Sequence, residues 1–120
     1  MAKILIVDDS RTSRRILRSI LEEAGHEIVG EAKDGQEGFD LYKELAPDVV
    51  TLDITMPVMD GIECLKLIKA DDPDSKVIMV TAAGQKTKMI EAVSNGADEF
   101  VSKPFDADDI KDIISGIVGE

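Results

Sequence analysis

Short apolar runs alternate with segments of helical periodicity along the whole chain. Three runs are continuous and rich in β-branched residues, at positions 4–7, 49–52 and 77–80. Such runs are typical of strands that are buried on both faces of a sheet. Two weaker strands are predicted at positions 27–31 and 99–102. The pattern therefore predicts five strands.

Helical patterns fill the segments that follow the strands. Positions 10–24 carry an apolar face and are followed by Gly25, a residue type that commonly ends helices. That face is formed by Ile16, Leu17, Ile20 and Leu21. Four further helices are predicted at positions 35–45, 61–70, 85–95 and 106–118. Each strand is thus followed by a helix.

This strict alternation defines the fold class. It predicts an α/β protein with a parallel sheet that is covered by helices on both faces and joined by right-handed crossovers. For five strands the natural doubly wound order is 2-1-3-4-5, as in flavodoxin-like folds. No linker, internal repeat or low-complexity tract interrupts the pattern, so we expect residues 1–120 to form one domain.

Acidic residues follow two strands that are neighbours in this order. Asp8 and Asp9 come directly after the first strand, and Asp53 directly after the third. In such sheets ligands bind beyond the carboxyl ends of the strands, where the strand order reverses. Two like charges about 4 Å apart cost about 4 kcal/mol at an effective dielectric near 20. A tight trio of carboxylates therefore needs a cation or a shifted protonation, and its oxygen ligands favour Mg²⁺.

Two other polar residues are expected at the same edge of the sheet. The fourth strand ends at Thr81 and the fifth ends close to Lys103, which Pro104 follows. A hydroxyl and an ammonium group are suited to contact phosphate oxygens. Phosphoryl transfer needs a nucleophile with positive charge and donors around the moving group. These side chains beside Asp53 predict phosphoryl chemistry.

The bulk composition narrows the setting and the partners. The net charge of −11 argues against direct nucleic-acid binding and against anionic membranes, because both need clustered Lys and Arg. Cys64 is the single cysteine and excludes an internal disulfide, and the chain shows neither a signal peptide nor a membrane-length apolar run. We therefore expect a cytoplasmic protein.

Four groups of short motifs occur in order along the chain: Val7-Asp8-Asp9, Asp53 with Met56-Pro57 and Asp60-Gly61, Val80-Thr81-Ala82, and Lys103-Pro104-Phe105. In these motifs and their spacing the chain resembles the receiver domains of two-component response regulators, most closely stand-alone chemotaxis regulators of the CheY type. The resemblance covers essentially the whole chain.

The resemblance implies a role for each residue of the site. Asp53 would be the phospho-acceptor, and Asp9 and Asp53 would bind Mg²⁺ directly, with Mn²⁺ as the alternative ion. Asp8 would act largely through water, and the backbone carbonyl of Thr55 would complete the protein ligands. The phosphoryl oxygens would be contacted by Thr81 and Lys103, the latter preceding a cis peptide bond to Pro104.

The resemblance also implies a switch. The phosphoryl group would draw Thr81 inward and free space for the ring of Phe100, which would bias the adjoining loop and the fourth helix. A plain core role for Phe100 is the alternative. Thr55 and Ala83 stand where side-chain choice in this family tunes dephosphorylation.

Basic side chains suggest two docking surfaces. All the arginines of the chain lie in the first predicted helix, on a stripe opposite its apolar face: Arg11, Arg14, Arg15 and Arg18. They would receive an acidic partner helix on a sensor histidine kinase or phosphotransfer protein. Lys86 and Lys88 would belong to an output surface, with a flagellar motor switch protein as a candidate target and a phosphatase as a further partner. Solvated surface charge is the alternative in both cases.

Other functions are weighed against this one. A receiver could also serve as a phosphorelay intermediate or be a piece of a larger regulator. A phosphatase of the haloacid-dehalogenase type would use the same chemistry, but it typically carries an acid two residues after the nucleophile, where this chain has Thr55. A flavin or nucleotide carrier would need a glycine-rich loop in place of Asp8 and Asp9. We therefore predict a non-enzymatic signalling switch.

Overall fold

Five strands alternate with five helices in the computed structural model of the chain, which describes residues 1–119. The strands are β1 (Lys3–Val7), β2 (Glu27–Ala32), β3 (Val49–Asp53), β4 (Lys76–Thr81) and β5 (Glu99–Ser102). The helices are α1 (Arg11–Glu23), α2 (Gly35–Leu45), α3 (Gly61–Asp71), α4 (Lys86–Ser94) and α5 (Ala107–Val118).

The strands form one parallel sheet in the order β2-β1-β3-β4-β5, so the predicted topology is confirmed. β1 is the second strand of this order: β2 pairs with it on the outer side, and the chain then returns past β1 to β3. The reversal lies between β1 and β3, where Val7 is paired with Leu52. The residues that follow these two strands therefore emerge side by side at one edge of the sheet.

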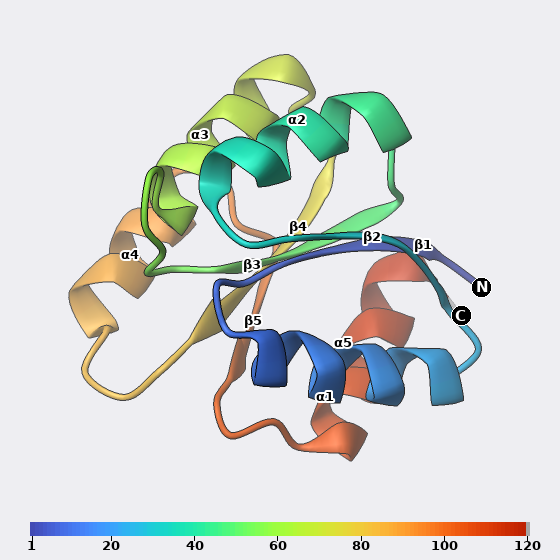
Figure 1. Cartoon of the computed structure of the whole chain (residues 1–120). Coiled ribbons are helices and arrows are strands. Elements are labelled where there is room, and N and C mark those ends of the chain that lie inside the picture. Colours follow the sequence, from blue (N-terminus) through green and yellow to red (C-terminus); the bar gives the residue numbers. More distant parts are fainter. Residues whose placement is uncertain (120) are drawn as a thin grey trace.

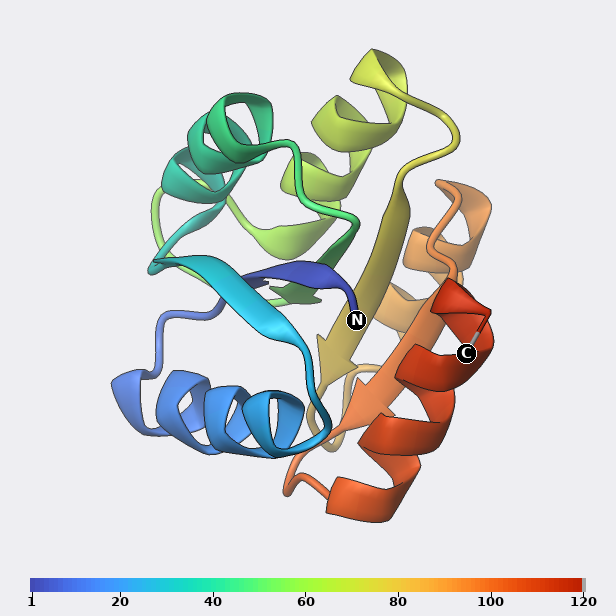
Figure 2. The same cartoon turned by 90° about the vertical axis from the view of Figure 1, so that its right-hand side faces the viewer.

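Helices cover both faces of the sheet, with α1 and α5 on one side and α2, α3 and α4 on the other (Figure 1). Figure 2 shows the same layers after a quarter turn. Alternate strand residues feed the two layers, because successive side chains of a strand point to opposite faces. Leu5 and Val7 enter the core under α2 and α3, whereas Ile4 and Ile6 enter the core over α1 and α5.

Four helices begin at a side-chain cap. In α1, α2, α3 and α5 an N-cap side chain accepts a hydrogen bond from the backbone N–H three residues later. These capping residues are Ser10, Asp34, Asp60 and Asp106. Ser10 and Asp106 were predicted to lie inside helices, but their extended backbone places them just before the first turn. In α4 the N-cap is Gln85, whose side chain makes no capping bond.

One residue of the predicted apolar face of α1 was placed wrongly. Ile16 is 46% exposed, whereas Leu17, Ile20 and Leu21 are buried as predicted. The residues that pack inward lie on a narrow stripe, and Ile16 falls outside it. None of the helices described between residues 1 and 119 combines the length and apolarity needed to cross a bilayer.

The loop after β3 contains a strained residue that gives a stability prediction. Val58 has a φ of 66°, and its side chain is 83% exposed. A β-branched residue in this left-handed region is disfavoured, and exposure means that little packing compensates. Val58→Gly should therefore raise the free energy of unfolding by about 1 kcal/mol, as measured by urea denaturation. A loss of stability would show that the valine side chain contributes packing in the loop.

Candidate functional site

Three carboxylates meet at the carboxyl end of the sheet, as the sequence predicted. Asp53 is the last residue of β3, and Asp8 and Asp9 follow β1. One oxygen from each of the three lies within 4.8 Å of the others. Asp8 and Asp53 are buried, while Asp9 is exposed. The cluster is therefore open to solvent on the side of Asp9.

Asp8 is held firmly in this cluster. Its backbone N–H donates to the carbonyl of Ala32 at 2.9 Å, and its Oδ1 accepts from the N–H of Ser10 at 2.8 Å. Its carbonyl accepts from Nη1 of Arg14 at 2.7 Å. These bonds fix both the backbone and one carboxylate oxygen, so Oδ2 remains directed at the site.

Lys103 brings the positive charge to the cluster. Its Nζ lies 2.9 Å from Oδ2 of Asp8 and 3.5 Å from Oδ2 of Asp53. Its backbone N–H donates to the carbonyl of Thr81 at 2.8 Å, and the bond to Pro104 is cis, as the resemblance implied. Burial alone would lower the pKa of Lys103, but the hydrogen bond to Asp8 and the nearby carboxylates raise it above its usual value. The lysine therefore stays charged.

Asp53 carries an unfavourable charge. Burial, followed by the charge of Asp8, raises its pKa from 3.8 to about 6, although Lys103 acts in the opposite direction. Two buried carboxylates share one ammonium group, and Asp9 adds a third negative charge. The donor set consists of carboxylate oxygens with excess negative charge, which fits a hard divalent cation.

This raised pKa predicts how stability depends on pH. Between about pH 4 and pH 6 the folded protein binds the Asp53 proton more tightly than the unfolded chain, so the free energy of unfolding falls as pH rises. Above about pH 6 Asp53 is ionised in the folded and the unfolded protein, so the destabilisation from burying its charge is present in full. Without divalent cations, Asp53→Asn should therefore be more stable than the wild type by about 1 to 3 kcal/mol near pH 7.5. Urea denaturation should show this gap closing near pH 4; a gap independent of pH would contradict the assignment.

Thr81 ends β4, the strand beside Asp53, and Phe100 lies on β5, where it is paired with Met79. Thr81 is buried, and its hydroxyl makes a long hydrogen bond of 3.4 Å to the carbonyl of Val101. Phe100 is half-buried and packs against the core layer under α2, α3 and α4. The hydroxyl of Thr81 thus has a weak partner on β5.

A link between the two loops that border the site was not predicted from the sequence. Nε2 of Gln85 donates to Oγ1 of Thr55 at 2.8 Å, and Oε1 of Gln85 accepts from the N–H of Ala82 at 2.6 Å. Thr55 lies two residues after Asp53, and Ala82 directly follows Thr81. No short sequence motif predicts this contact, because Gln85 and Thr55 lie 30 residues apart.

The arginine stripe on α1 is partly neutralised within the protein. Arg14 Nε and Arg18 Nη1 both form ion pairs with Glu31 at the end of β2, the first at 3.1 Å. Arg14 is only 17% exposed. Arg11 and Arg15 are exposed. The predicted stripe therefore contains two structural cations and two exposed ones, and Glu31 is the acidic partner that the helix pattern does not show.

The second predicted docking surface lies on α4. Lys86 and Lys88 are exposed, and two apolar side chains on the same helix are exposed as well, Ile90 at 61% and Val93 at 60%. Met89 is half-buried and packs toward the core. Basic and apolar side chains are thus both accessible on this helix.

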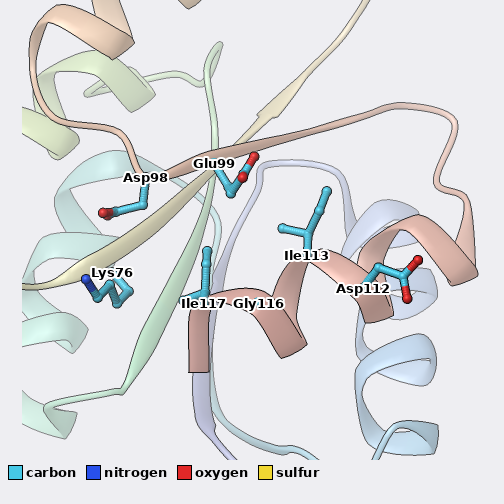
Figure 3. Close-up of a pocket in the computed structure, with 7 residues that line it drawn as sticks. All are labelled: Lys76, Asp98, Glu99, Asp112, Ile113, Gly116 and Ile117. Atoms are coloured by element: carbon cyan, nitrogen blue, oxygen red, sulfur yellow. The ribbon is translucent and has the colours of Figure 1, made fainter. Parts of the chain in front are cut away.

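A surface pocket of about 490 Å³ lies at the start of β4 and β5 and along α5 (Figure 3). It is lined by Lys76, Asp98, Glu99, Asp112, Ile113, Gly116 and Ile117. Asp98 already binds the Nζ of Lys69 at 2.9 Å and the N–H of Val77 at 2.8 Å. The pocket is at the opposite end of the strands from the carboxylates and takes no part in their chemistry.

Comparison with known proteins gives consistent relatives. The family described as response regulator receiver domain matches residues 4–115. Protein CcdB of Bacillus subtilis is 47% identical over 119 residues, which is 99% of each chain. Chemotaxis protein CheY of Thermotoga maritima is 48% identical over 103 residues, which is 86% of each chain.

Solved structures show the same fold. A chain of the CheX–CheY–BeF3–Mg complex from Borrelia burgdorferi is 37% identical, with a TM-score of 0.91 over 97% of this chain and 88% of that one. A response regulator receiver domain protein from Clostridium thermocellum is 33% identical, with a TM-score of 0.93 over 99% of this chain and 95% of that one.

Proposed function

The chain belongs to the response regulator receiver domain family, and from this premise we propose that Asp53 accepts the phosphoryl group. The protein is a phospho-acceptor switch of a two-component system. The observation that carries the assignment to Asp53 is its place between Asp8, Asp9 and Lys103. The carboxylate of Asp8 accepts from the N–H of Ser10 and lies 2.9 Å from Nζ of Lys103, whereas within residues 1–119 the carboxylate of Asp53 has only the longer contact of 3.5 Å with that lysine.

The acids would hold a divalent cation, Mg²⁺ or Mn²⁺. Asp9 and Asp53 would bind it directly, Asp8 largely through water, and the backbone carbonyl of Thr55 would complete the protein ligands. When bound, the ion offsets the negative charge of the carboxylates and of the incoming phosphoryl group. Burial and the neighbouring charge of Asp8, which together raise the pKa of Asp53, and the meeting of three carboxylates support this proposal.

The other roles in phosphoryl transfer are assigned to side chains of the protein. Ionised Asp53 attacks phosphorus with a carboxylate oxygen, so that a P–O bond forms as the bond to the donor breaks. The ammonium group of Lys103, already within 3.5 Å of Asp53, donates to the phosphoryl oxygens. The hydroxyl of Thr81 exchanges its weak bond to Val101 for one to the phosphoryl group. That movement opens space for the half-buried ring of Phe100 and so alters the surface near β5 and α4.

Labelling with a small phosphodonor tests this function. Acetyl phosphate with Mg²⁺ should add one phosphoryl group to the purified protein, detected by intact mass. Chelation of the cation should prevent the reaction, because the carboxylates would then repel the donor. A protein that takes up no phosphoryl group and also fails to bind BeF3⁻ with Mg²⁺ would contradict the proposal.

Chemotaxis is the pathway that the relatives support best. Several relatives of similar length are named chemotaxis protein CheY, including that of Bacillus subtilis at 46% identity over 94% of each chain. A sensor histidine kinase or phosphotransfer protein would supply the phosphoryl group, and a phosphatase would remove it. The output target would be a flagellar motor switch protein. Service as a phosphorelay intermediate is the alternative.

The arginines of α1 would meet the kinase or phosphotransfer protein, and the structure separates them by availability. Arg11 and Arg15 are exposed, whereas Arg14 and Arg18 are tied to Glu31. Arg11→Glu combined with Arg15→Glu should slow transfer from the cognate kinase about tenfold or more at low salt, because complementary charge steers encounter. Labelling by acetyl phosphate should be unchanged. Kinase transfer at the wild-type rate would remove α1 from the docking surface.

Lys86 and Lys88 would contribute to an output surface together with the exposed Ile90 and Val93 of α4. A surface that combines apolar and basic groups suits a partner helix with an apolar face and acidic flanks. The helix α4 begins five residues after Thr81, at the end of the loop that carries Ala82. This position supports control of the output surface by phosphorylation.

A further inference from the structure

Gln85 joins two loops that come from different strands. Its amide nitrogen donates to the hydroxyl of Thr55 in the loop after β3, and its amide oxygen accepts from the N–H of Ala82 in the loop after β4. The two distances are 2.8 and 2.6 Å. No other side-chain hydrogen bond between these two loops is present in the described part of the chain, residues 1–119.

These two hydrogen bonds form a bridge, and both of its ends lie next to residues of the proposed site. Thr55 lies two residues after Asp53, and Ala82 follows Thr81 directly. Because a peptide plane is rigid, the N–H of Ala82 moves together with the carbonyl of Thr81. That carbonyl also accepts from the N–H of Lys103 at 2.8 Å. The end of β4 is thus held from the side of β5 by backbone and from the side of β3 by the amide of Gln85.

The missing capping bond at the start of α4 supports a role for the Gln85 side chain in joining the loops. Gln85 is the N-cap of α4, yet it makes no side-chain capping bond, whereas the other four helices each have one. An N-cap side chain normally satisfies an N–H of the first helical turn. Here the amide is turned toward the loops instead, so the helix start gives up a cap while the loops are tied together.

We propose that Gln85 is a positioning residue that holds the β4–α4 loop in its unmodified arrangement and so sets how readily Thr81 moves toward Asp53. The inference rests on the proposed function of Asp53 and Thr81. In the described arrangement the hydroxyl of Thr81 is bonded to Val101, not to Asp53. A movement of the Thr81 backbone toward Asp53 displaces Ala82, whose N–H the Gln85 amide holds. The bridge therefore favours the unmodified state.

The test is the affinity for BeF3⁻ in the presence of Mg²⁺, measured by isothermal titration calorimetry. Gln85→Ala removes the bridge and should tighten binding roughly 3- to 10-fold, which corresponds to one or two exposed hydrogen bonds. Thr55→Val removes the other end of the bridge and should shift the affinity in the same direction. The double variant should bind no more tightly than Gln85→Ala alone, because the two residues act through one link.

A matched control separates the bridge from a general effect of losing a glutamine. Gln36 lies on α2 and donates through Nε2 to Asp40 at 3.1 Å, far along the chain from both loops. Gln36→Ala should leave BeF3⁻ affinity unchanged. Amide exchange of Ala82, followed by NMR without BeF3⁻, should accelerate in Gln85→Ala and stay as in the wild type in Gln36→Ala.

The outcomes are distinct. Wild-type affinity or weaker binding in Gln85→Ala would overturn the inference, and so would additive effects in the double variant. A lower melting temperature with unchanged affinity would assign Gln85 to the start of α4 alone. If the wild-type protein binds BeF3⁻ in an Asp53-dependent manner, such results leave the proposed function intact. If it does not bind BeF3⁻, this inference is wrong, and the proposed function is wrong as well if acetyl phosphate adds no phosphoryl group.

Discussion

Replacement of Asp53 by asparagine is expected to abolish labelling by acetyl phosphate. The variant lacks the carboxylate oxygen that would attack phosphorus, and it removes one of the three negative charges that would hold the cation. Asp8 is a poor substitute, because its Oδ1 accepts from Ser10 and its Oδ2 is paired with Lys103. Intact mass should therefore show no added phosphoryl group.

The control for this experiment is another aspartate outside the cluster. Asp108 is exposed in the first turn of α5, and Asp108→Asn makes the same chemical change. It should be labelled as fast as the wild type. Persistent stoichiometric labelling of Asp53→Asn would place the acceptor on another residue and remove the central assignment.

Gly61→Ala is expected to be the most damaging small substitution for the fold. A Cβ at Gly61 would lie 2.0 Å from the carbonyl oxygen of Asp53, and that oxygen belongs to rigid backbone at the end of β3. The N–H of Gly61 also donates to the carbonyl of Ile54 at 2.8 Å, which fixes the approach of α3. We expect the free energy of unfolding to fall by about 3 kcal/mol, because neither backbone segment can move away freely.

Chemical denaturation of a matched glycine variant tests this reason. Gly116 lies within α5, and a Cβ built there meets no heavy atom within 4 Å. Gly116→Ala should raise the free energy of unfolding by about 0.5 to 1 kcal/mol, since alanine favours the helix. Equal effects of the two substitutions would show that the approach of Gly61 to Asp53 is not tight. Labelling of Gly61→Ala should also be slower, because a shift of the β3 carboxyl end moves Asp53 itself.

The fold holds the carboxylate of Asp8 more firmly than that of Asp53, the acid that is proposed to react. Asp8 is supported by bonds to Ser10, Ala32 and Arg14, and Arg14 is in turn held by Glu31. The backbone of Asp53 is held in β3, but its carboxylate has only the 3.5 Å contact with Lys103 among residues 1–119 and carries the raised pKa. A fixed acid beside a less restrained one suits a site in which a single carboxylate is modified while the others hold their positions.

Much of this protein is determined by its sequence alone. The β-branched runs and the helical patterns predicted all ten elements, each to within one residue of the bounds observed. The predicted order of the strands was correct, because right-handed crossovers leave few arrangements for five alternating strands and helices. The meeting of Asp8, Asp9 and Asp53 followed directly, since residues after neighbouring parallel strands must emerge at the same edge.

The contacts of individual side chains were decided by the tertiary structure. The pattern of α1 placed Ile16 inside and the four arginines on one free stripe, but Ile16 is exposed and Glu31 binds two of the arginines. The bridge from Gln85 to Thr55 likewise joins residues 30 positions apart. Periodicity reports which side of an element is apolar, because that property repeats over a few residues. Which polar groups meet depends on how separate elements pack, and this is settled only when the whole chain has folded.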